Sequence, residues 1–371
     1  MQPLIKWPGG KSSEFQIIKK YIPEFNRYIE PFFGGGAVFF NLPISTSIIN
    51  DISTNLMQFY LAIKNRNKVF INYLYSINEE WEKLKKLASL KANLLIPFYK
   101  QYRNNQSNFD EFIDLIKFSC SDVTKSIVNN SMILHLNNLH KIETEIYRMV
   151  HGKIIRTLSN EVKNKKNLSD DDLYENIITG FTSGYYMCLR NTLNMLERST
   201  NNNTIPEYKL AIFYFIREYC YGSMFRYNNL GDFNIPYGGI AYNHKDFKKK
   251  IDTIISDEVY LRLKNAEILS TDFENVLNMA ASNDFIFLDP PYDTNFSNYE
   301  NRNFDEQDHV RLEGRLQNLK CKFLLIIKNT MFIEQLYSKN KYNIHAFDNQ
   351  YAYCVKGRND RNAVHLIITN Y

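Results

Sequence analysis

Cysteine is scarce in this sequence, with five among 371 residues. The five are odd in number and far apart, they form no C-x-x-C pair, and no histidine lies nearby at a metal-ligand spacing. This pattern argues against a disulfide framework. It predicts reduced thiols in a cytoplasmic protein with no metal site, at Cys120, Cys188, Cys220, Cys321 and Cys354.

Long apolar runs and a signal-peptide pattern are also absent. No run approaches the ~18 apolar residues that a membrane helix needs, so we expect neither membrane insertion nor secretion. Lys and Arg number 45 against 40 Asp and Glu, and the net charge of +5 is too small to indicate a polyanionic partner by itself. The length and a hydrophobic content of 44% allow two domains, or one domain with a large insertion.

The first 66 residues have the pattern of an α/β opening. A glycine turn, Gly34-Gly35-Gly36, lets the backbone approach a ligand closely, and an acid that ends the next strand, Asp51, can hold both hydroxyls of a ribose. A plain tight turn and a helix N-cap remain open as alternatives for these two features. The pattern predicts strands over 27–30 and 47–50, and helices from about Ala37 and over 53–64.

A second α/β pattern resumes near residue 247, so the two ends of the chain supply one sheet. Asp272 and Phe273 follow a predicted strand and can meet a purine ring, although Phe273 fits the core equally well. The pattern predicts strands over 266–270, 285–288, 321–327 and 363–369, and helices from about 273 to 281 and over 305–319.

The motif Asp289-Pro290-Pro291-Tyr292 directly follows the apolar run over 285–288. An exocyclic amine is a poor nucleophile because its lone pair is delocalised into the ring. The Asp289 carboxylate and the Pro290 carbonyl can each accept one N–H of such an amine, and Tyr292 can stack on the base. The motif therefore predicts a catalytic site for amine chemistry, with an ordinary strand end as the alternative.

Residues from about 67 to 246 interrupt the sheet pattern and are mostly helical in character. Ser169 followed by three aspartates predicts a helix start, and the aromatic stripe that continues to about Arg198 is interpreted as core. Basic side chains near the end of this insertion are candidates for phosphate contacts, namely Arg217, Arg226, Lys245 and Lys248-Lys249-Lys250. A solvated charged face remains open as the alternative for the lysine triplet.

An ordered series of motifs resembles the Dam-like, alpha-group DNA adenine N6-methyltransferases over roughly residues 1–66 and 220–371. One such motif could arise by chance, whereas the ordered series hardly could. It comprises Lys6-Trp7-Pro8-Gly9-Gly10-Lys11, Glu30-Pro31-Phe32-Phe33-Gly34-Gly35-Gly36, Asn50-Asp51, Thr271-Asp272-Phe273, Asp289-Pro290-Pro291-Tyr292 and the segment from Arg226 to Gly238.

The resemblance implies S-adenosyl-L-methionine as the cofactor and assigns roles to individual residues. Trp7 and Lys11 would lie beside the cofactor. The turn that contains Phe32, Gly34 and Gly36 would surround its methionine part, Asp51 would hold its ribose, and Asp272 and Phe273 its adenine. Asp289 would touch both cofactor and target.

The resemblance also implies duplex DNA as the substrate, with the target adenine flipped out of the stack against Tyr292. Residues 226–238 look like the DNA-contacting hairpin of the family, and Arg226, Tyr227 and Asn228 are the candidate DNA contacts. GATC readers of the family carry a basic residue where this chain has Leu230. Leucine cannot make the bidentate contact of arginine with guanine, so GATC specificity is not expected from this position.

Together these features predict an α/β fold with a Rossmann-like methyltransferase sheet and a mostly helical inserted target-recognition domain. The predicted parts are a catalytic and cofactor domain over 1–66 and 247–371, interrupted by a DNA-binding insertion over 67–246. We expect a monomeric enzyme of a restriction–modification system or a mobile element, with a cognate restriction endonuclease as partner in the former case. The alternatives are a cytosine-N4 or RNA adenine methyltransferase, and a catalytically silent DNA-binding regulator.

Overall fold

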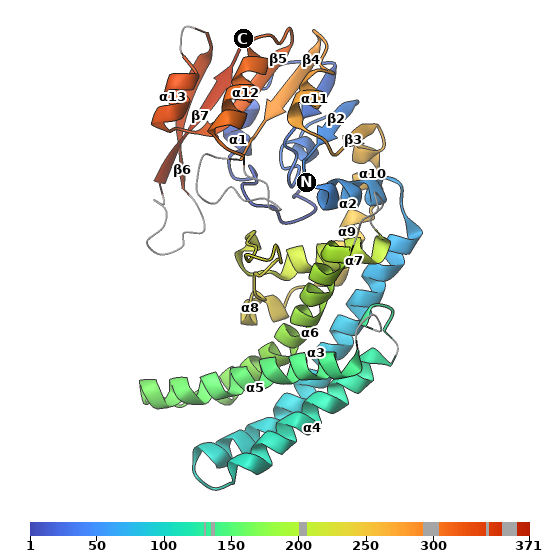
Figure 1. Ribbon diagram of the computed structural model, residues 1–371, viewed down its shortest axis with the longest axis vertical. Helices are drawn as coiled ribbons and strands as arrows, with labels where there is room; N and C mark the ends of the chain where they lie inside the picture. Colours follow the sequence, from blue (N-terminus) through green and yellow to red (C-terminus); the bar gives the residue numbers. More distant parts are fainter. Residues whose placement is uncertain (130, 135–137, 200–205, 292–303, 339–340, 351–361) are drawn as a thin grey trace. The chain divides into compact units, whose positions relative to one another are not determined.

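The computed structural model describes residues 1–129, 131–134, 138–199, 206–291, 304–338, 341–350 and 362–371. The chain divides into two compact units (Figure 1). The sheet unit comprises Met1–Arg66, Met224–Gly231 and Thr253–Tyr371, and the helical unit comprises Asn67–Ser223 and Asp232–Asp252. No helix in the described part of the chain is both long enough and apolar enough to cross a membrane.

The described residues of the sheet unit form a seven-stranded sheet with the order β3-β2-β1-β4-β5-β7-β6. The first five strands in this order are parallel, and β7 runs antiparallel to β5 and β6. Every residue of β2 and β4 is buried, as expected for central parallel strands that are covered on both faces. The strands are β1 Arg27–Glu30, β2 Ser47–Asn50, β3 Ala266–Leu269, β4 Asp284–Leu288, β5 Lys322–Lys328, β6 Asn343–Gln350 and β7 Asn362–Thr369.

Alternation of side chains along the strands builds a core on each face of the sheet. Ile286 and Leu288 of β4 belong to one core, together with residues of α11, α12 and α13. Phe285 of β4 points to the other face, where its ring lies 5.5 Å from Phe25 and 6.1 Å from Tyr28. The helices of this unit are α1 Phe15–Ile18, η1 Lys19–Tyr21, η2 Phe39–Asn41, α2 Thr54–Lys64, α10 Asp257–Leu263, α11 Phe273–Leu277, α12 Glu306–Leu316 and α13 Met331–Leu336.

The predicted α/β class is confirmed, with several local differences. The helix expected from about 273 to 281 ends at Leu277, and α13 was not predicted. The helix expected from about Ala37 is only the short 3₁₀ turn η2, because Leu42 precedes Pro43 and takes an extended conformation that ends the turn. The edge strand β6 was not predicted. Its sequence, Asn-Ile-His-Ala-Phe-Asp-Asn-Gln, lacks the continuous apolar run of the central strands.

The helical unit is built from long helices, in agreement with the helical character predicted for the insertion. Glycines allow two of them to pack closely: a Cβ on Gly180 would lie 2.9 Å from the Cα of Val150, and one on Gly184 would lie 2.8 Å from the Cα of Ile146. The helices are α3 Lys68–Arg103, α4 Phe109–Val128, α5 Leu139–Asn164, α6 Asp170–Ser199, α7 Glu207–Tyr219, η4 Tyr221–Ser223 and α8 Ile240–Asn243, with α9 Phe247–Ile254 at the boundary with the sheet unit.

Candidate active site

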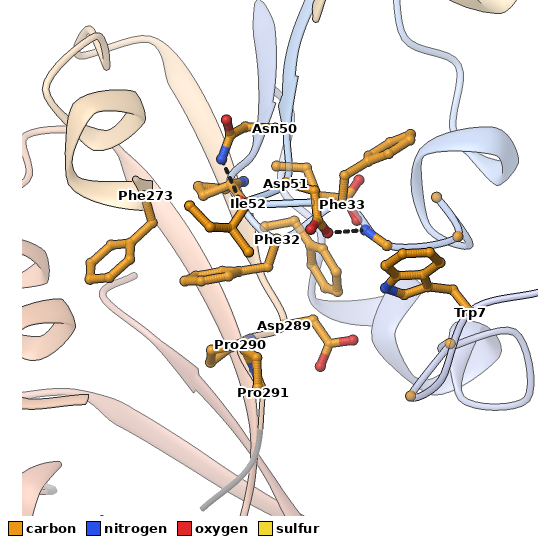
Figure 2. A pocket seen from close by; sticks show the side chains of 18 of the residues that line it. Trp7, Phe32, Phe33, Asn50, Asp51, Ile52, Phe273, Asp289, Pro290 and Pro291 are labelled. Carbon is orange, nitrogen blue, oxygen red and sulfur yellow. Dashed lines mark hydrogen bonds between the residues drawn. The ribbon is translucent and has the colours of Figure 1, made fainter. Parts of the chain in front are cut away.

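A cavity of about 450 Å³ lies in the sheet unit at the carboxyl ends of β1, β2 and β4. The strand order reverses direction between β1 and β4, and ligands of open α/β sheets bind at such a switch point. The volume lies within the ~300–1,000 Å³ range of small-molecule sites. The candidate residues that line the cavity are Trp7, Lys11, Phe32, Gly34, Gly36, Asp51, Asp272, Phe273, Asp289, Pro290 and Pro291 (Figure 2).

Asp51 is held at the end of β2 by two backbone N–H groups. Gly34 donates to its Oδ2 at 2.9 Å, and Ser53 donates to its Oδ1 at 3.0 Å. Ser53, rather than Asp51, caps α2 by accepting a hydrogen bond from the Leu56 N–H. Burial raises the pKa of Asp51 to about 6, although both backbone donors oppose the shift. Each carboxylate oxygen keeps a free lone pair with which it can accept a ligand hydroxyl.

Asn50 fixes the relative positions of the loops around the cavity. Its Nδ2 donates to the carbonyl of Pro31 at 3.0 Å and to the carbonyl of Thr271 at 3.1 Å, and its Oδ1 accepts from the Thr271 N–H at 2.9 Å. Asn50 is 1% exposed, so these bonds are shielded from water. One buried amide therefore connects the ends of β1, β2 and β3.

The glycine turn after β1 requires its glycines. Gly34 and Gly36 have φ values of +50° and +68°, in the left-handed region that side chains disfavour. A Cβ on Gly34 would lie 2.9 Å from Cδ1 of Trp7, and one on Gly36 would lie 2.7 Å from Cζ of Phe33. The turn thus presents bare backbone to the cavity while neighbouring aromatic rings pack against it.

Aromatic rings form one end of the cavity. The Phe32 ring points toward Phe273, with the ring centroids 5.5 Å apart, and Phe304 packs at 5.5 Å from Phe32 and 5.8 Å from Phe273 (Figure 2). Phe33, the next residue, instead packs on Tyr60 at 4.8 Å. The three phenylalanines offer an apolar surface on which a planar ring can pack.

Arg311 of α12 connects the acidic residues at this end of the cavity. Its guanidinium donates to Asp272 at 3.0 Å, to Glu274 at 2.6 Å and to Asp308 at 2.6 Å, and it lies 4.9 Å from the centroid of the Phe273 ring. Asp272 also caps α11, since its Oδ1 accepts from the Glu274 N–H at 3.0 Å. Oδ1 of Asp272 thus accepts hydrogen bonds from both the Glu274 N–H and the Arg311 guanidinium.

Asp289 follows β4 directly and forms an ion pair with Lys11, with 2.8 Å between Oδ1 and Nζ. Lys11 is 3% exposed, and its Nζ also donates to the carbonyl of Gly9 at 2.8 Å. Burial raises the pKa of Asp289, and the adjacent ammonium of Lys11 opposes that shift. Lys11 therefore favours the ionised carboxylate at a position where burial alone would favour the neutral acid.

Carboxyl groups outnumber basic side chains in the described wall of the cavity. Five acidic side chains line it, against the single basic side chain of Lys11: Glu30, Asp51, Asp272, Asp289 and Asp308. Burial raises the pKa of Glu30 well above its usual range and so favours its neutral form, although Glu30 accepts a 2.8 Å hydrogen bond from the Tyr28 hydroxyl that opposes the shift. Lys11 pairs with Asp289, and Arg311 pairs with Asp272 and Asp308, so these cations offset much of the remaining negative charge.

The candidate DNA contacts Arg226, Tyr227 and Asn228 are not among the residues that line the cavity. They lie in Met224–Gly231, the short segment that belongs to the sheet unit. Asn228 forms a turn in which its carbonyl accepts from Gly231 and its Oδ1 accepts from Leu230, each at 2.9 Å, and the Leu230 side chain is 78% exposed. Tyr292, the last residue of the catalytic motif, lies outside the described residues.

One interpretation of the basic residues needs correction. Arg217 is 1% exposed and donates to the Ser223 carbonyl at 2.7 Å, so its guanidinium is not a surface phosphate contact. Lys245 is half-buried, lies 3.0 Å from the centroid of the Tyr242 ring and donates to the Glu218 carbonyl, and its role as a phosphate contact stays a prediction. Charge in the sequence does not distinguish buried cations from exposed ones.

Several residues of the site were not among the sequence candidates. Glu30 and Asn50 stand inside the motifs, but the sequence assigns them no role of their own. In the structure Glu30 accepts a hydrogen bond from Tyr28, and Asn50 donates one to Pro31. Asp308 and Arg311 lie three residues apart on a predicted helix, and this spacing is a usable signal for their ion pair. Nothing in the sequence indicates that Arg311 also reaches Asp272.

The sheet order and a cavity lined by carboxyl groups at the switch point define an α/β protein with a candidate small-molecule site. A family model of the D12 class N6 adenine-specific DNA methyltransferases matches residues 7–132 and 136–353. The chain therefore belongs to this family.

Individual relatives match along much of the chain. The type II methyltransferase M.CviBI of Paramecium bursaria Chlorella virus NC1A is 25% identical over 379 residues, with 100% of both chains covered. The type II methyltransferase M1.LlaDCHI of Lactococcus lactis subsp. cremoris is 23% identical, covering 100% of this chain and 96% of the relative. The type II methyltransferase M.MjaIII of Methanocaldococcus jannaschii is 26% identical, covering 84% of this chain and 78% of the relative.

Proposed function

We propose that this protein transfers the methyl group of S-adenosyl-L-methionine to N6 of a flipped-out adenine at specific sites in duplex DNA. The observation that carries the proposal is the Asp289–Lys11 ion pair, in which Lys11 is 3% and Asp289 18% exposed, at the edge of the cavity directly after β4 at the switch point of the sheet. Family membership supports the reaction class, and the names of the relatives support a role in a restriction–modification system. A cognate endonuclease that acts on the same site is part of this proposal.

The residues of the cavity fit S-adenosyl-L-methionine. Asp51 offers lone pairs for ribose hydroxyls, and the Phe32, Phe273 and Phe304 rings offer a packing surface for adenine. The absent Cβ atoms of Gly34 and Gly36 leave room for the Trp7 and Phe33 rings, and the backbone of the turn lines the cavity where the methionine part is proposed to lie. Carboxyl groups outnumber basic side chains in the described lining, which suits a sulfonium and an ammonium, although Lys11 and Arg311 offset part of the negative charge.

Asp289 and Pro290 are proposed to act on the target amine. The Asp289 carboxylate and the Pro290 carbonyl each accept one N–H, which localises the nitrogen lone pair for attack. Lys11 favours the ionised form of Asp289 against the effect of burial and holds its Oδ1, leaving Oδ2 for the amine. When bound, S-adenosyl-L-methionine supplies an activated methyl group. The proton that the amine loses leaves along its hydrogen bond to Asp289.

The substitution Asp289→Asn tests this role. It removes the charge that pairs with Lys11 and acts on the amine, so we expect kcat for methyl transfer to fall by at least ~100-fold, as for other preorganised polar groups. The measurement is transfer of a radiolabelled methyl group from S-adenosyl-L-methionine to unmodified duplex DNA.

Asp284→Asn is the matched control, because Asp284 begins the same strand and pairs with Arg27 at 2.6 Å, away from the cavity. We expect this variant to retain most of the wild-type kcat. Undiminished transfer by Asp289→Asn would remove Asp289 from the mechanism. A wild-type protein that binds DNA but transfers no label would instead indicate a silent DNA-binding regulator.

A further inference from the structure

Phe225 connects the segment of the candidate DNA contacts to the wall of the cavity. Its ring packs edge to face on Trp7, with the centroids 4.7 Å apart and an interplanar angle of 69°. The Phe225 ring is also nearly parallel to the Tyr227 ring, with the centroids 6.4 Å apart and an interplanar angle of 23°. These contacts fall within the sheet unit, although the chain on both sides of Met224–Gly231 belongs to the helical unit.

Trp7 is also in contact with the glycine turn that forms the cavity. It lines the cavity itself, and its indole is so close to Gly34 that a Cβ there would lie 2.9 Å from Cδ1. The N–H of Gly34 in turn donates to Asp51 at 2.9 Å. A continuous series of contacts thus leads from Asp51 through Gly34 and Trp7 to Phe225.

We propose that Phe225 is a positioning residue that couples cofactor binding to DNA engagement by Tyr227; this inference rests on the proposed function. A ligand that contacts Asp51 and the glycine turn restricts Trp7, and Trp7 then gives Phe225 a fixed surface. Cofactor binding thereby orders Met224–Gly231 in part, so less conformational entropy is lost when this segment binds DNA. Cofactor and DNA therefore bind with positive cooperativity.

The test compares DNA affinity with and without the cofactor product in the full-length protein. The probe is a fluorescent unmodified duplex taken from a region that the wild-type protein methylates, and the ligand is S-adenosyl-L-homocysteine at saturation. For the wild type we expect the ligand to tighten DNA binding within the ~5–150-fold range of usual couplings. The affinity for the ligand, measured by calorimetry, should rise by the same factor when DNA is present, since coupling is reciprocal.

Phe225→Leu removes the ring but keeps an apolar side chain, so its coupling factor should fall to about one while the protein stays folded. Phe225→Tyr keeps the ring and should retain the coupling. The matched control is Phe25→Leu, a half-buried phenylalanine of the same unit that stacks on Phe285 at 5.5 Å, and it should also retain the coupling.

Coupling that is unchanged in Phe225→Leu overturns the inference, and so does a wild-type protein that binds both ligands without coupling. Neither result affects the proposed reaction, which is read from methyl transfer. A wild-type protein that binds neither S-adenosyl-L-homocysteine nor DNA would instead overturn the proposed function.

Discussion

At the scale of single residues, the site is defined by carboxyl groups that burial makes less acidic and by the partners that oppose this effect. Asp289 forms an ion pair with the ammonium of Lys11, and Asp51 accepts hydrogen bonds from the N–H groups of Gly34 and Ser53. Burial raises the pKa of both carboxyl groups in spite of these partners. Cofactor binding should therefore depend on pH near neutrality, well above the range in which an exposed aspartate titrates.

We expect S-adenosyl-L-homocysteine to bind more weakly as the pH falls from 7.5 to 5. Ribose hydroxyls donate best to an ionised Asp51, and its pKa is about 6, so affinity should be nearly constant above pH 7 and about tenfold lower at pH 5. Calorimetry across this range measures the effect. In Asp51→Asn the affinity should be lower at neutral pH and the pH dependence near 6 should be lost. The same dependence in this variant would contradict the assignment to Asp51.

The effect of pH on protein stability through Asp51 has the opposite sign to its effect on ligand affinity. The folded pKa of Asp51 lies above its ordinary value of 3.8, so the folded protein binds this proton more tightly than the unfolded chain. The stability that the bound proton contributes is complete below pH 3.8 and is lost as the pH rises to about 6. Asp51 thus lowers the free energy of unfolding in the pH range where it serves the ligand.

The residue scale also sets a limit on prediction from sequence. Asp51 and Asp289 could be predicted because each stands in a recognisable motif, and both line the cavity. The buried pair of His365 and Glu14, 3.2 Å apart, joins residues from opposite ends of the chain and has no local signal. Arg217 looked like a surface cation and is buried, because the sequence does not reveal which side of its helix is covered.

At the scale of elements, the strands that could be predicted have apolar residues at their centres. The strands β1 and β2 have their predicted bounds, and each has two apolar residues between polar ends, Tyr28-Ile29 in β1 and Ile48-Ile49 in β2. The edge strand β6 contains several polar residues, so its sequence did not predict a strand. The glycines of α6 gave no signal either, although they determine how closely α5 packs against it.

Gly184→Ala tests the packing of α5 and α6. A methyl group there would lie 2.8 Å from the Cα of Ile146, so we expect the free energy of unfolding to fall by about 1–3 kcal/mol, as for other overpacked sites. Gly152→Ala in α5 is the control, because nothing lies within 4 Å of its Cβ position. This variant should gain about 0.5–1 kcal/mol from helix propensity. Chemical denaturation measures both values, and equal effects of the two substitutions would contradict the close packing.

At the scale of the whole molecule, the two units separate the chemistry from the long insertion. Every described residue that lines the cavity belongs to the sheet unit. The helical unit begins at Asn67, and its later boundary lies at Asp252, with Met224–Gly231 excluded. The spacing of the motifs predicted that an insertion interrupts the sheet unit near residue 66. It could not show that a short segment inside the insertion packs with the sheet unit, because that depends on contacts such as Phe225 with Trp7.

The division of the chain predicts where a ligand stabilises it. At about 100 times its Kd, S-adenosyl-L-homocysteine should stabilise the folded sheet unit by ~2.7 kcal/mol. We expect slower hydrogen exchange in β1, β2, β4 and the glycine turn, and little change in α3, α4 and α5. Hydrogen exchange read by mass spectrometry reports each segment separately. Equal protection throughout both units would contradict a cofactor site confined to the sheet unit.

The central claim is that this chain methylates adenine N6 in DNA, and the methylated nucleoside itself tests it most directly. Unmodified duplex DNA is incubated with the purified protein and S-adenosyl-L-methionine carrying a deuterated methyl group, and the digested nucleosides are separated by mass spectrometry. The account predicts deuterated N6-methyldeoxyadenosine with the wild type, and a loss of at least ~100-fold with Asp289→Asn. Label in N4-methyldeoxycytidine, or no label in the DNA at all, would contradict it.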